Sequence, residues 1–268
     1  MTTKVLGLNA LIAAKGFVLN SYLQLPGAFS AEVYAAQGWD AITLDTQHGL
    51  IGYHDAVAIL QAIARTGVLP LVRVPGLESG AIMKLLDAGA LGITCAMINT
   101  AADAERLVRI CKYPPRGERS FGPARAALVH GEDYARRADS LVSVLAMVET
   151  AEAVANIDAI LGVDGIDGIY LGPADLAQSM GRPVGIGDLD PAVAAAIERV
   201  RAACVARGKI VGMIAPDPMR AWQLVERGFR FVSLSSDMRA LAGQAKAWVE
   251  GFRRCAAAAV PTPPPTRA

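Results

Sequence analysis

The sequence predicts a (β/α)8 barrel, and three observations support this fold class. Short apolar runs typical of strands alternate with longer helical stretches over nearly the whole chain, as in repeated β-α units around a parallel sheet. These runs number eight, and each is followed by a helical stretch. A chain of 268 residues has the length at which such barrels form one undivided domain. We therefore expect a single barrel domain over residues 1–255.

The strands and helices follow one another in a regular order. Strands are expected at residues 17–23, 41–45, 69–74, 92–97, 141–149, 168–171, 210–214 and 231–235. Helices are expected after them, in the same order, at residues 30–37, 54–65, 80–88, 102–111, 150–161, 191–207, 218–227 and 237–253. Several of these helices open with Ser, Thr, Asp or Pro, which cap a helix or fit its first turn. A doubly wound open sheet is the main rival, but residues 23–28 lack the glycine-rich turn of a dinucleotide site.

Two segments break this alternation. Residues 113–140 contain Pro114, Pro115 and five arginines, at positions 116, 119, 125, 136 and 137, but no strand pattern. Long inserted loops are often functional, so we expect this one over the mouth of the barrel or in a contact between subunits. Residues 256–268 are rich in Ala and Pro and have little to bury, which predicts a disordered tail.

The composition favours a cytoplasmic protein that does not bind nucleic acid or membranes. The 26 basic and 25 acidic residues are interspersed, so the chain has no basic field for nucleic acid or an anionic membrane. The four cysteines show no pairing rhythm, which favours reduced thiols. Residues 5–14 are apolar but make a poor signal sequence, and no run reaches the ~18 apolar residues of a membrane span.

The candidate site lies where the predicted strands end, because barrel enzymes gather their chemistry at the carboxyl ends of the strands. The second strand runs into Asp45 and then His48, the third ends at Arg73, the fifth ends at Glu149, and the sixth is followed by Asp175. The sequence thus predicts an acid-base pair, a cation and two carboxylates at one edge of the barrel.

Asp45 and His48 are three residues apart, across a predicted tight turn. The carboxylate is expected to accept a hydrogen bond from the imidazole, fix its tautomer and raise its basicity, so that His48 acts as the base. The alternative is that His48 merely caps the loop. Arg73, at the end of a buried strand, is expected to meet an anion such as a substrate carboxylate or an enolate oxygen. Its alternative is a structural ion pair with a neighbouring acid.

Glu149 and Asp175 are the candidate metal ligands. Two carboxylates, with waters and a bidentate substrate, would complete the octahedral oxygen shell of Mg²⁺ or Mn²⁺. The alternative is that each acid only stabilises the helix that follows it. The run Gly172-Pro173-Ala174 adds amide groups of Gly172 and Ala174 at a helix start, where an anionic group is favoured. The six lysines lie before strands or on helices and connections, so a Schiff-base route is not supported and enolate chemistry must rely on a metal.

From about Gly16 to Pro216 the sequence resembles the class II pyruvate aldolases of the HpcH/HpaI family, of the 4-hydroxy-2-oxoheptanedioate aldolase type. The motifs that carry the resemblance lie at residues 39–40, 44–49, 71–75, 113–117, 119–122, 148–150, 170–176, 179–181 and 212–216. The resemblance implies a (β/α)8 barrel that cleaves 4-hydroxy-2-oxo acids to pyruvate and an aldehyde through a metal-stabilised enolate. It also implies a role in the catabolism of aromatic compounds.

The resemblance assigns a role to each site residue. Glu149 and Asp175 would bind a divalent metal (Mg²⁺, Mn²⁺ or Co²⁺), and Arg73 would bind the keto oxygen and stabilise the enolate. His48, oriented by Asp45, would act as acid-base through a metal-bound water. The substrate pocket would comprise Gly172, Pro173, Ala174 and Ile214 in addition to Arg73, with the backbone amides around residues 173–175 holding the substrate carboxylate.

The resemblance also implies a homohexamer, a dimer of trimers, in which Asp87 reaches the site of a neighbouring subunit. Two departures from the family pattern are Met147, where some members have Gln, and Ala96, where Pro is usual. The first removes a polar contact near the site and puts the choice of aldehyde in question. Two rival functions remain: a β-hydroxyacyl-CoA lyase of the citrate lyase β-subunit type, whose CoA phosphates the arginine-rich insert would bind, and a non-catalytic barrel.

Overall fold

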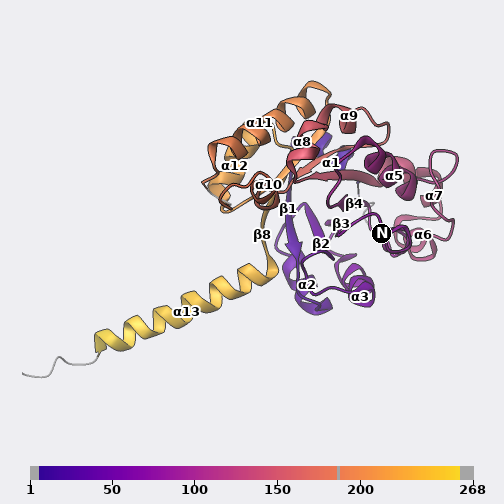
Figure 1. Ribbon diagram of the computed structural model, residues 1–268. Helices are drawn as coiled ribbons and strands as arrows, with labels where there is room; N and C mark the ends of the chain where they lie inside the picture. The colour runs from indigo at the N-terminus through magenta and orange to yellow at the C-terminus, as the bar shows by residue number, and fades with distance from the viewer. Residues whose placement is uncertain (1–5, 186–187, 260–268) are drawn as a thin grey trace, which may run out of the picture.

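The computed structural model, which describes residues 6–185 and 188–259, contains a closed barrel of eight parallel strands in sequential order (Figure 1). The predicted barrel is therefore confirmed, and the open sheet is excluded. The strands are β1 (Val18–Leu23), β2 (Ala41–Asp45), β3 (Leu69–Val74), β4 (Gly92–Cys95), β5 (Ser143–Val148), β6 (Gly168–Leu171), β7 (Ile210–Ala215) and β8 (Phe231–Ser236).

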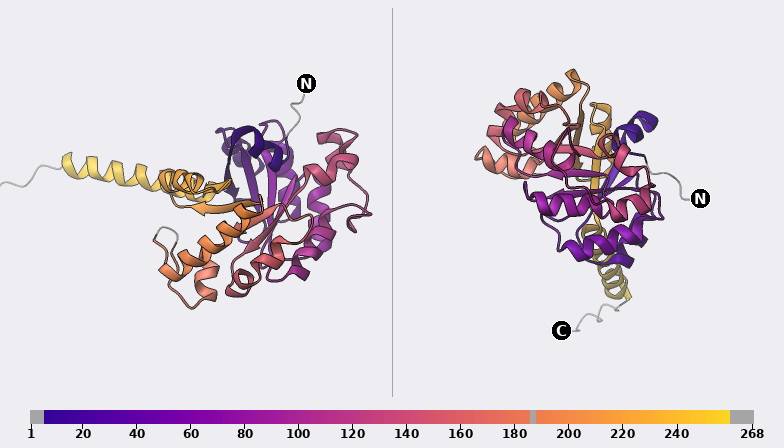
Figure 2. Two further views of the ribbon diagram at one scale, coloured as in Figure 1. Left: turned by 90° about the horizontal axis from the view of Figure 1, so that it is seen from above. Right: turned by 90° about the vertical axis from the view of Figure 1, so that its right-hand side faces the viewer.

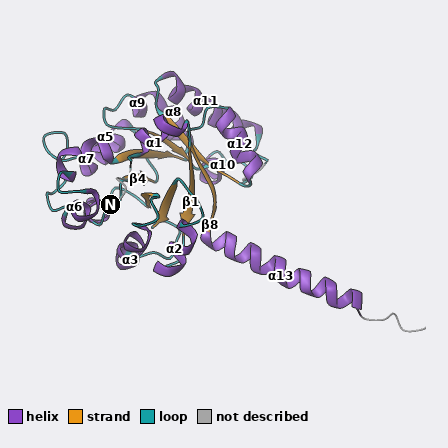
Figure 3. Cartoon of the chain, turned by 180° about the vertical axis from the view of Figure 1, so that it is seen from behind, coloured by secondary structure: helices purple, strands orange, loops and turns teal. Residues whose placement is uncertain are grey.

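Most of the helices lie around the barrel and connect successive strands, while the first precedes the barrel and the last follows it (Figure 3). They are α1 (Leu8–Lys15), α2 (Ala28–Ala35), α3 (Tyr53–Ile63), α4 (Ser79–Asp87), α5 (Ala101–Cys111), α6 (Ala124–His130), α7 (Tyr134–Leu141), α8 (Ala151–Ala155), α9 (Ile157–Leu161), α10 (Pro173–Ser179), α11 (Pro191–Ala206), α12 (Pro218–Glu226) and α13 (Asp237–Ala259). All residues of β2, β4, β5 and β6 are buried, which explains why these strands read in the sequence as continuous apolar runs.

Strand register fixes which side chains are neighbours inside the barrel. In the β2–β3 pair, Asp45 stands opposite Arg73, so both side chains reach the same end of the barrel from adjacent strands. Deeper in the barrel, the buried Asn20 donates a hydrogen bond to Ser233 Oγ and accepts one from Thr43 Oγ1, at 2.8 and 2.9 Å. The polar layer below the site is therefore satisfied by its own members, as burial requires.

Several element boundaries differ from the predictions. The fourth strand ends at Cys95, and the helix expected over residues 150–161 is interrupted at Asn156. Helix α1 was not predicted. Its Leu8 is fully buried, and its Asn9 donates to Asp167 just before β6, so α1 covers the amino end of the barrel.

The insert at residues 113–140 forms α6 and α7 and does not cover the barrel mouth. It joins the end of α5 to the start of β5, and in a parallel barrel that connection lies at the amino ends of the strands. Arg125 accordingly donates to the carbonyl oxygens of Ala88 and Leu60 there. The expectation that the insert lies over the mouth is wrong for this chain's own barrel, and the expected subunit contact remains a prediction.

Helix α13 does not fold back onto the barrel as the other helices do, and it projects away from it (Figures 1 and 2). A disordered tail was expected from residue 256, but the helix continues to Ala259. Residues 260–268 lie outside the described part of the chain, so that part of the expectation is untested.

The four cysteines are unpaired, and three of them, Cys95, Cys111 and Cys204, are buried, as expected of reduced thiols that fill the core. Within the described residues, the structure contains no helix that is both long and apolar enough to cross a membrane.

Candidate active site

A cavity of about 220 Å³ lies at the carboxyl ends of the strands and gathers most of the predicted site residues. The predicted residues that line it are His48, Arg73, Gly172, Pro173, Ala174, Asp175 and Ile214. They come from β2, β3, β6 and β7 and the segments that follow these strands, so residues far apart in the sequence converge because parallel strands end at one edge.

Asp45 binds Arg73 and the backbone of the loop that carries His48. Its carboxylate accepts hydrogen bonds from Arg73 Nε at 3.0 Å and Nη2 at 2.6 Å, and from Gln24 Nε2 at 3.0 Å. It also accepts from the backbone N–H groups of Gln47 and His48, at 3.2 and 3.1 Å. Burial raises the pKa of Asp45, but the hydrogen bonds and charge of Arg73 outweigh it, so the net pKa lies below its ordinary value.

The expected hydrogen bond between Asp45 and the imidazole of His48 is not formed. The contact is with the backbone N–H of His48, and the side chain that Asp45 binds is that of Arg73. Asp45 thus positions the loop, while the exposed His48 ring stands at the cavity.

Arg73 is held in place from two sides. Its guanidinium carbon lies 4.8 Å from the centre of the Tyr22 ring, and Asp45 binds two of its three nitrogen atoms. The ion pair that the sequence left as an alternative is therefore present. Nη1 of Arg73 has no partner among the described residues, so it can donate a hydrogen bond to a ligand in the cavity.

Glu149 is a buried carboxylate with one unsatisfied oxygen. Its Oε1 accepts the N–H of Met97 at 2.9 Å, while its Oε2 is buried and has no hydrogen-bond partner within the described residues. Burial and the nearby charge of Asp175 raise the pKa of Glu149 to about 7, although the Met97 N–H and Arg73 oppose the shift. A buried oxygen without a partner is costly, and a cation beside it would remove that cost.

Gly172 is packed against this oxygen. A Cβ atom at this position would come within 2.5 Å of Glu149 Oε2 and within 2.8 Å of the Met147 methyl group. Any larger residue here would displace the carboxylate, so glycine keeps the space around Oε2 open.

Glu149 and Asp175 fit a site for a hard divalent cation. Asp175 lies in the first turn of α10, is half-buried and lines the cavity, and its charge acts on Glu149. Within residues 6–185 and 188–259, no group of three or more His, Cys, Asp or Glu gathers in the manner of a closed metal site. Mg²⁺ is commonly bound by one or two carboxylates, while water and substrate fill the other positions of its coordination shell.

One part of the predicted anion site is wrong. The N–H of Gly172 donates to the carbonyl of Val148 at 3.2 Å, which extends the pairing of β5 and β6, so it is not available to a ligand. Pro173 has no N–H, and Ala174 lies in the first turn of α10, where amide groups lack partners within the helix. The amides of Ala174 and Asp175 remain as donors to a substrate carboxylate.

The two departures from the family pattern have visible consequences. Ala96 donates its N–H to the carbonyl of Val74 at 3.0 Å, a hydrogen bond that a proline could not make. The next residue, Met97, adopts a left-handed conformation (φ 58°) and directs its N–H to Glu149. Met147 is buried and lines the cavity with its thioether, so the wall beside Glu149 is apolar there.

Asp87 does not join this site within its own chain. It ends α4, which runs antiparallel to the strands, and therefore lies near the opposite end of the barrel. There its Oδ1 forms an ion pair with Nη2 of Arg119, a buried residue of the insert, at a distance of 2.7 Å. Its predicted role in a neighbouring subunit remains a prediction.

Sequence reasoning missed further residues around the cavity. Gln24 binds Asp45, Tyr22 and Tyr170 form part of the wall, and Arg239 stands at the rim. Gln24 and Arg239 each lie just past the end of a strand, β1 and β8 respectively, so the rule that located Asp175 could have located them too.

Comparisons with known proteins identify the relatives of this chain. Residues 20–243 match the model of the HpcH/HpaI aldolase/citrate lyase family. A hydroxypyruvate/pyruvate aldolase of Rhizorhabdus wittichii is 42% identical over 228 residues, covering 85% of this chain and 91% of the relative. A 4-hydroxy-2-oxovalerate aldolase of Rhodococcus jostii is 38% identical over 239 residues, covering 88% of this chain and 91% of the relative.

The fold is also similar to a solved structure. The crystal structure of an HpcH/HpaI aldolase/citrate lyase family protein from Burkholderia cenocepacia aligns with a TM-score of 0.84 and 32% identity, covering 92% of this chain and 98% of that one. The relatives named above as aldolases support an enzyme with lyase activity. This chain belongs to the HpcH/HpaI aldolase/citrate lyase family.

Proposed function

We propose that this protein is a divalent-metal-dependent aldolase that reversibly cleaves 4-hydroxy-2-oxo acids into pyruvate, or a related 2-oxo acid, and an aldehyde. The observation that carries the proposal is that Glu149 Oε2, beside the charge of Asp175, is buried and has no hydrogen-bond partner in residues 6–185 and 188–259. The relatives named as pyruvate and 4-hydroxy-2-oxovalerate aldolases support the choice of reaction.

Each residue of the site has a distinct task in this reaction. Glu149 and Asp175 would hold a divalent cation, which supplies positive charge where negative charge develops on the keto oxygen. Arg73, fixed by Asp45, would donate Nη1 to the same oxygen without reorganisation, which is the basis of electrostatic catalysis. The amides of Ala174 and Asp175 would bind the substrate carboxylate.

His48 would move the proton on the aldehyde side of the substrate. Its ring is exposed at the cavity and has no hydrogen-bond partner among the described residues. His48→Ala is therefore expected to lower the rate of C–C cleavage by about 10² to 10⁴-fold, the usual range for a general acid-base. Exchange of the pyruvate methyl protons with deuterium, followed by NMR, should be affected far less. Equal losses in cleavage and exchange would contradict this role.

The proposed function is tested by pyruvate release from a panel of 4-hydroxy-2-oxo acids. The enzyme is first treated with a chelator and then assayed with Mg²⁺, Mn²⁺ or Co²⁺ or without an added ion. We expect turnover only with a divalent ion. Full activity in excess chelator would reject the metal role, and absence of pyruvate release from every substrate and ion would reject the reaction.

The rival reaction on CoA thioesters loses the support of the insert. The arginines of the insert could have bound phosphate groups near the cavity, but the insert lies at the other end of this chain's barrel. Arg119, for example, is buried there against Asp87.

We also propose that the protein forms a homo-oligomer in which α13 packs on a second copy. A 23-residue helix of about 35 Å leaves the barrel with Leu241, Trp248 and Phe252 exposed along one side, by 64%, 70% and 76%. On the barrel, Phe29 of α2 is 77% exposed and Met219 of α12 is 72% exposed. These two helices follow β1 and β7, the strands on either side of β8, from which α13 extends. Apolar surface on both the helix and the barrel supports mutual burial between copies.

The double substitution Trp248→Ala and Phe252→Ala tests this arrangement. We expect a smaller assembly by light scattering coupled to size-exclusion chromatography, because two large aromatic anchors would be lost from the interface. Lys246→Ala, on the same helix, should leave the assembly unchanged. A wild-type protein that runs at its monomer mass of 28.0 kDa would contradict the proposal.

A further inference from the structure

We propose that Arg239 selects acceptor aldehydes that carry a negatively charged group, a carboxylate or a phosphate, at the end distant from the reacting carbon. This inference rests on the proposed aldolase function and specifies its substrate class. It arises from an arginine at the rim of the cavity that the catalytic roles above do not use.

The position of Arg239 matches the part of the cavity left for the acceptor. The proposed donor site is formed by Glu149 and Asp175, which follow β5 and β6, whereas Arg239 follows β8. Between them the cavity continues past Ile214 of β7 to Ser235 and Ser236 at the end of β8. A 2-oxo acid bound at the carboxylates would therefore leave the β8 side of the cavity to the second substrate.

The first turn of α13 is fixed to the barrel even though the rest of the helix projects away. Asp237 is buried, and its Oδ1 and Oδ2 accept the N–H groups of Gln24 and Leu25, at 2.8 and 3.2 Å. Ser236 Oγ accepts the N–H of Arg239 at 3.3 Å. The backbone of Arg239 is thus held at a defined place beside the cavity, as a specificity residue requires.

The charge of Arg239 is not paired with an acidic side chain among the described residues. Two arginines line the cavity, and Arg73 is bound by Asp45 through two of its nitrogen atoms. The Arg239 guanidinium is exposed and has no hydrogen-bond or ion-pair partner among the residues that the structure describes. The nearest acid in the sequence, Asp237, has both oxygens occupied by backbone N–H groups. A carboxylate or phosphate is the natural partner of a free guanidinium, which binds either group through two parallel hydrogen bonds.

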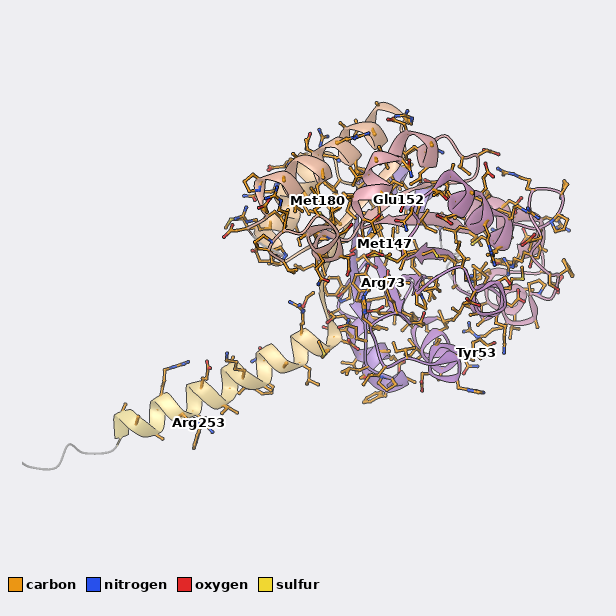
Figure 4. The ribbon with its side chains drawn as sticks, viewed as in Figure 1. Tyr53, Arg73, Met147, Glu152, Met180 and Arg253 are labelled. Carbon is orange, nitrogen blue, oxygen red and sulfur yellow. The ribbon has the colours of Figure 1, made fainter. Side chains whose placement is uncertain are left out.

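The test compares pairs of acceptors with the same number of carbon atoms, one with an anionic group at the distant end and one without it. With pyruvate as donor, succinic semialdehyde is compared with butanal, and glyceraldehyde 3-phosphate is compared with glyceraldehyde. Initial rates of pyruvate consumption give kcat and KM for the wild type, Arg239→Gln, Arg239→Lys and Arg253→Gln. Arg253 is a matched control because it lies on the same helix but far from the barrel (Figure 4).

For at least one pair, we expect the ratio of kcat/KM values, charged over neutral acceptor, to fall about fivefold in Arg239→Gln, the upper end for the loss of an ion pair at an exposed site. The fall should come from KM, and Arg239→Lys should restore part of it. Arg253→Gln should keep the wild-type ratio. The pair that responds distinguishes a carboxylate from a phosphate.

Two results would overturn this assignment. One is a ratio that Arg239→Gln leaves unchanged in both pairs, and the other is an equal fall in Arg253→Gln, which would indicate a general effect of helix charge. Either result with normal turnover of neutral acceptors leaves the aldolase function standing. Absence of turnover with every acceptor and divalent ion would instead reject the proposed function itself.

Discussion

Replacing Glu149 by Gln is expected to lower the rate of pyruvate release by at least about 10³-fold, the upper end of the range for one preorganised electrostatic partner. The amide keeps the shape of the side chain and can still accept the N–H of Met97. It removes the negative charge beside Asp175, where the proposed cation would bind, and a neutral amide is a poor ligand in a site with only two carboxylates.

The loss should be visible without any assay of activity. Calorimetric titration with Mn²⁺ is expected to show binding to the wild type and none to Glu149→Gln. The matched control is Glu152→Gln, three residues further along the chain and exposed on α8. An unchanged affinity for Mn²⁺ in Glu149→Gln would show that the ion binds elsewhere.

The pH dependence of ion binding provides an independent check. In the absence of an ion, burial and Asp175 raise the pKa of Glu149 to about 7, so below that pH a proton must leave before the cation binds. The apparent affinity should therefore weaken up to about tenfold for each pH unit below about 7. The stability of the ion-free protein should change with pH in the opposite direction to ion binding. Because the folded state raises the pKa of Glu149, this residue contributes to the free energy of unfolding at low pH, and the contribution is lost as the pH rises through about 7.

Replacing Asp45 by Asn is expected to lower the free energy of unfolding by about 3 to 5 kcal/mol, the cost of removing one partner of a buried ion pair. Asp45 is fully buried and accepts five hydrogen bonds, from Arg73, Gln24 and the loop of His48. An asparagine would direct an NH₂ group at some of these donors and leave the charge of Arg73 uncompensated. Because Arg73 would lose its fixed orientation, activity should fall by at least about 10²-fold.

Urea unfolding and pyruvate release measure the two effects separately. Asp40→Asn is a useful control because Asp40 directly precedes β2, whereas Asp45 ends it. Among the residues that the structure describes, Asp40 accepts hydrogen bonds only from the N–H of Leu19 and from the exposed Lys15. That substitution should cost about 1 kcal/mol and leave activity unchanged. If Asp45→Asn were as stable and as active as the control, Asp45 would not be what orients Arg73.

Much of the site could be predicted from strand ends alone. Arg73, Glu149 and Asp175 come near one another because each follows an apolar run, and all such runs end at the same edge of a parallel barrel. The same rule would have found Gln24 and Arg239 had it been applied to β1 and β8. The identity of these residues is a property of the sequence, and their convergence follows from the fold class.

The partners of each side chain could not be predicted in this way. Asp45 lies three residues from His48, so sequence distance favoured that pair, but the register of β2 and β3 places Asp45 opposite Arg73. Likewise, the amide of Gly172 is used by the pairing of β5 and β6, which no local pattern reveals. Hydrogen bonds depend on register and on distances of tenths of an ångström, and these arise only when the strands pack.

The sequence by itself determined the barrel, the order of its elements and the set of charged residues at the strand ends, because apolar periodicity and strand polarity are local properties. Only the tertiary structure decided that Arg73 belongs to Asp45, that the insert and Asp87 lie away from the cavity, and that α13 leaves the barrel. These outcomes depend on packing between residues far apart in the sequence, which decides the partner that each buried charge meets.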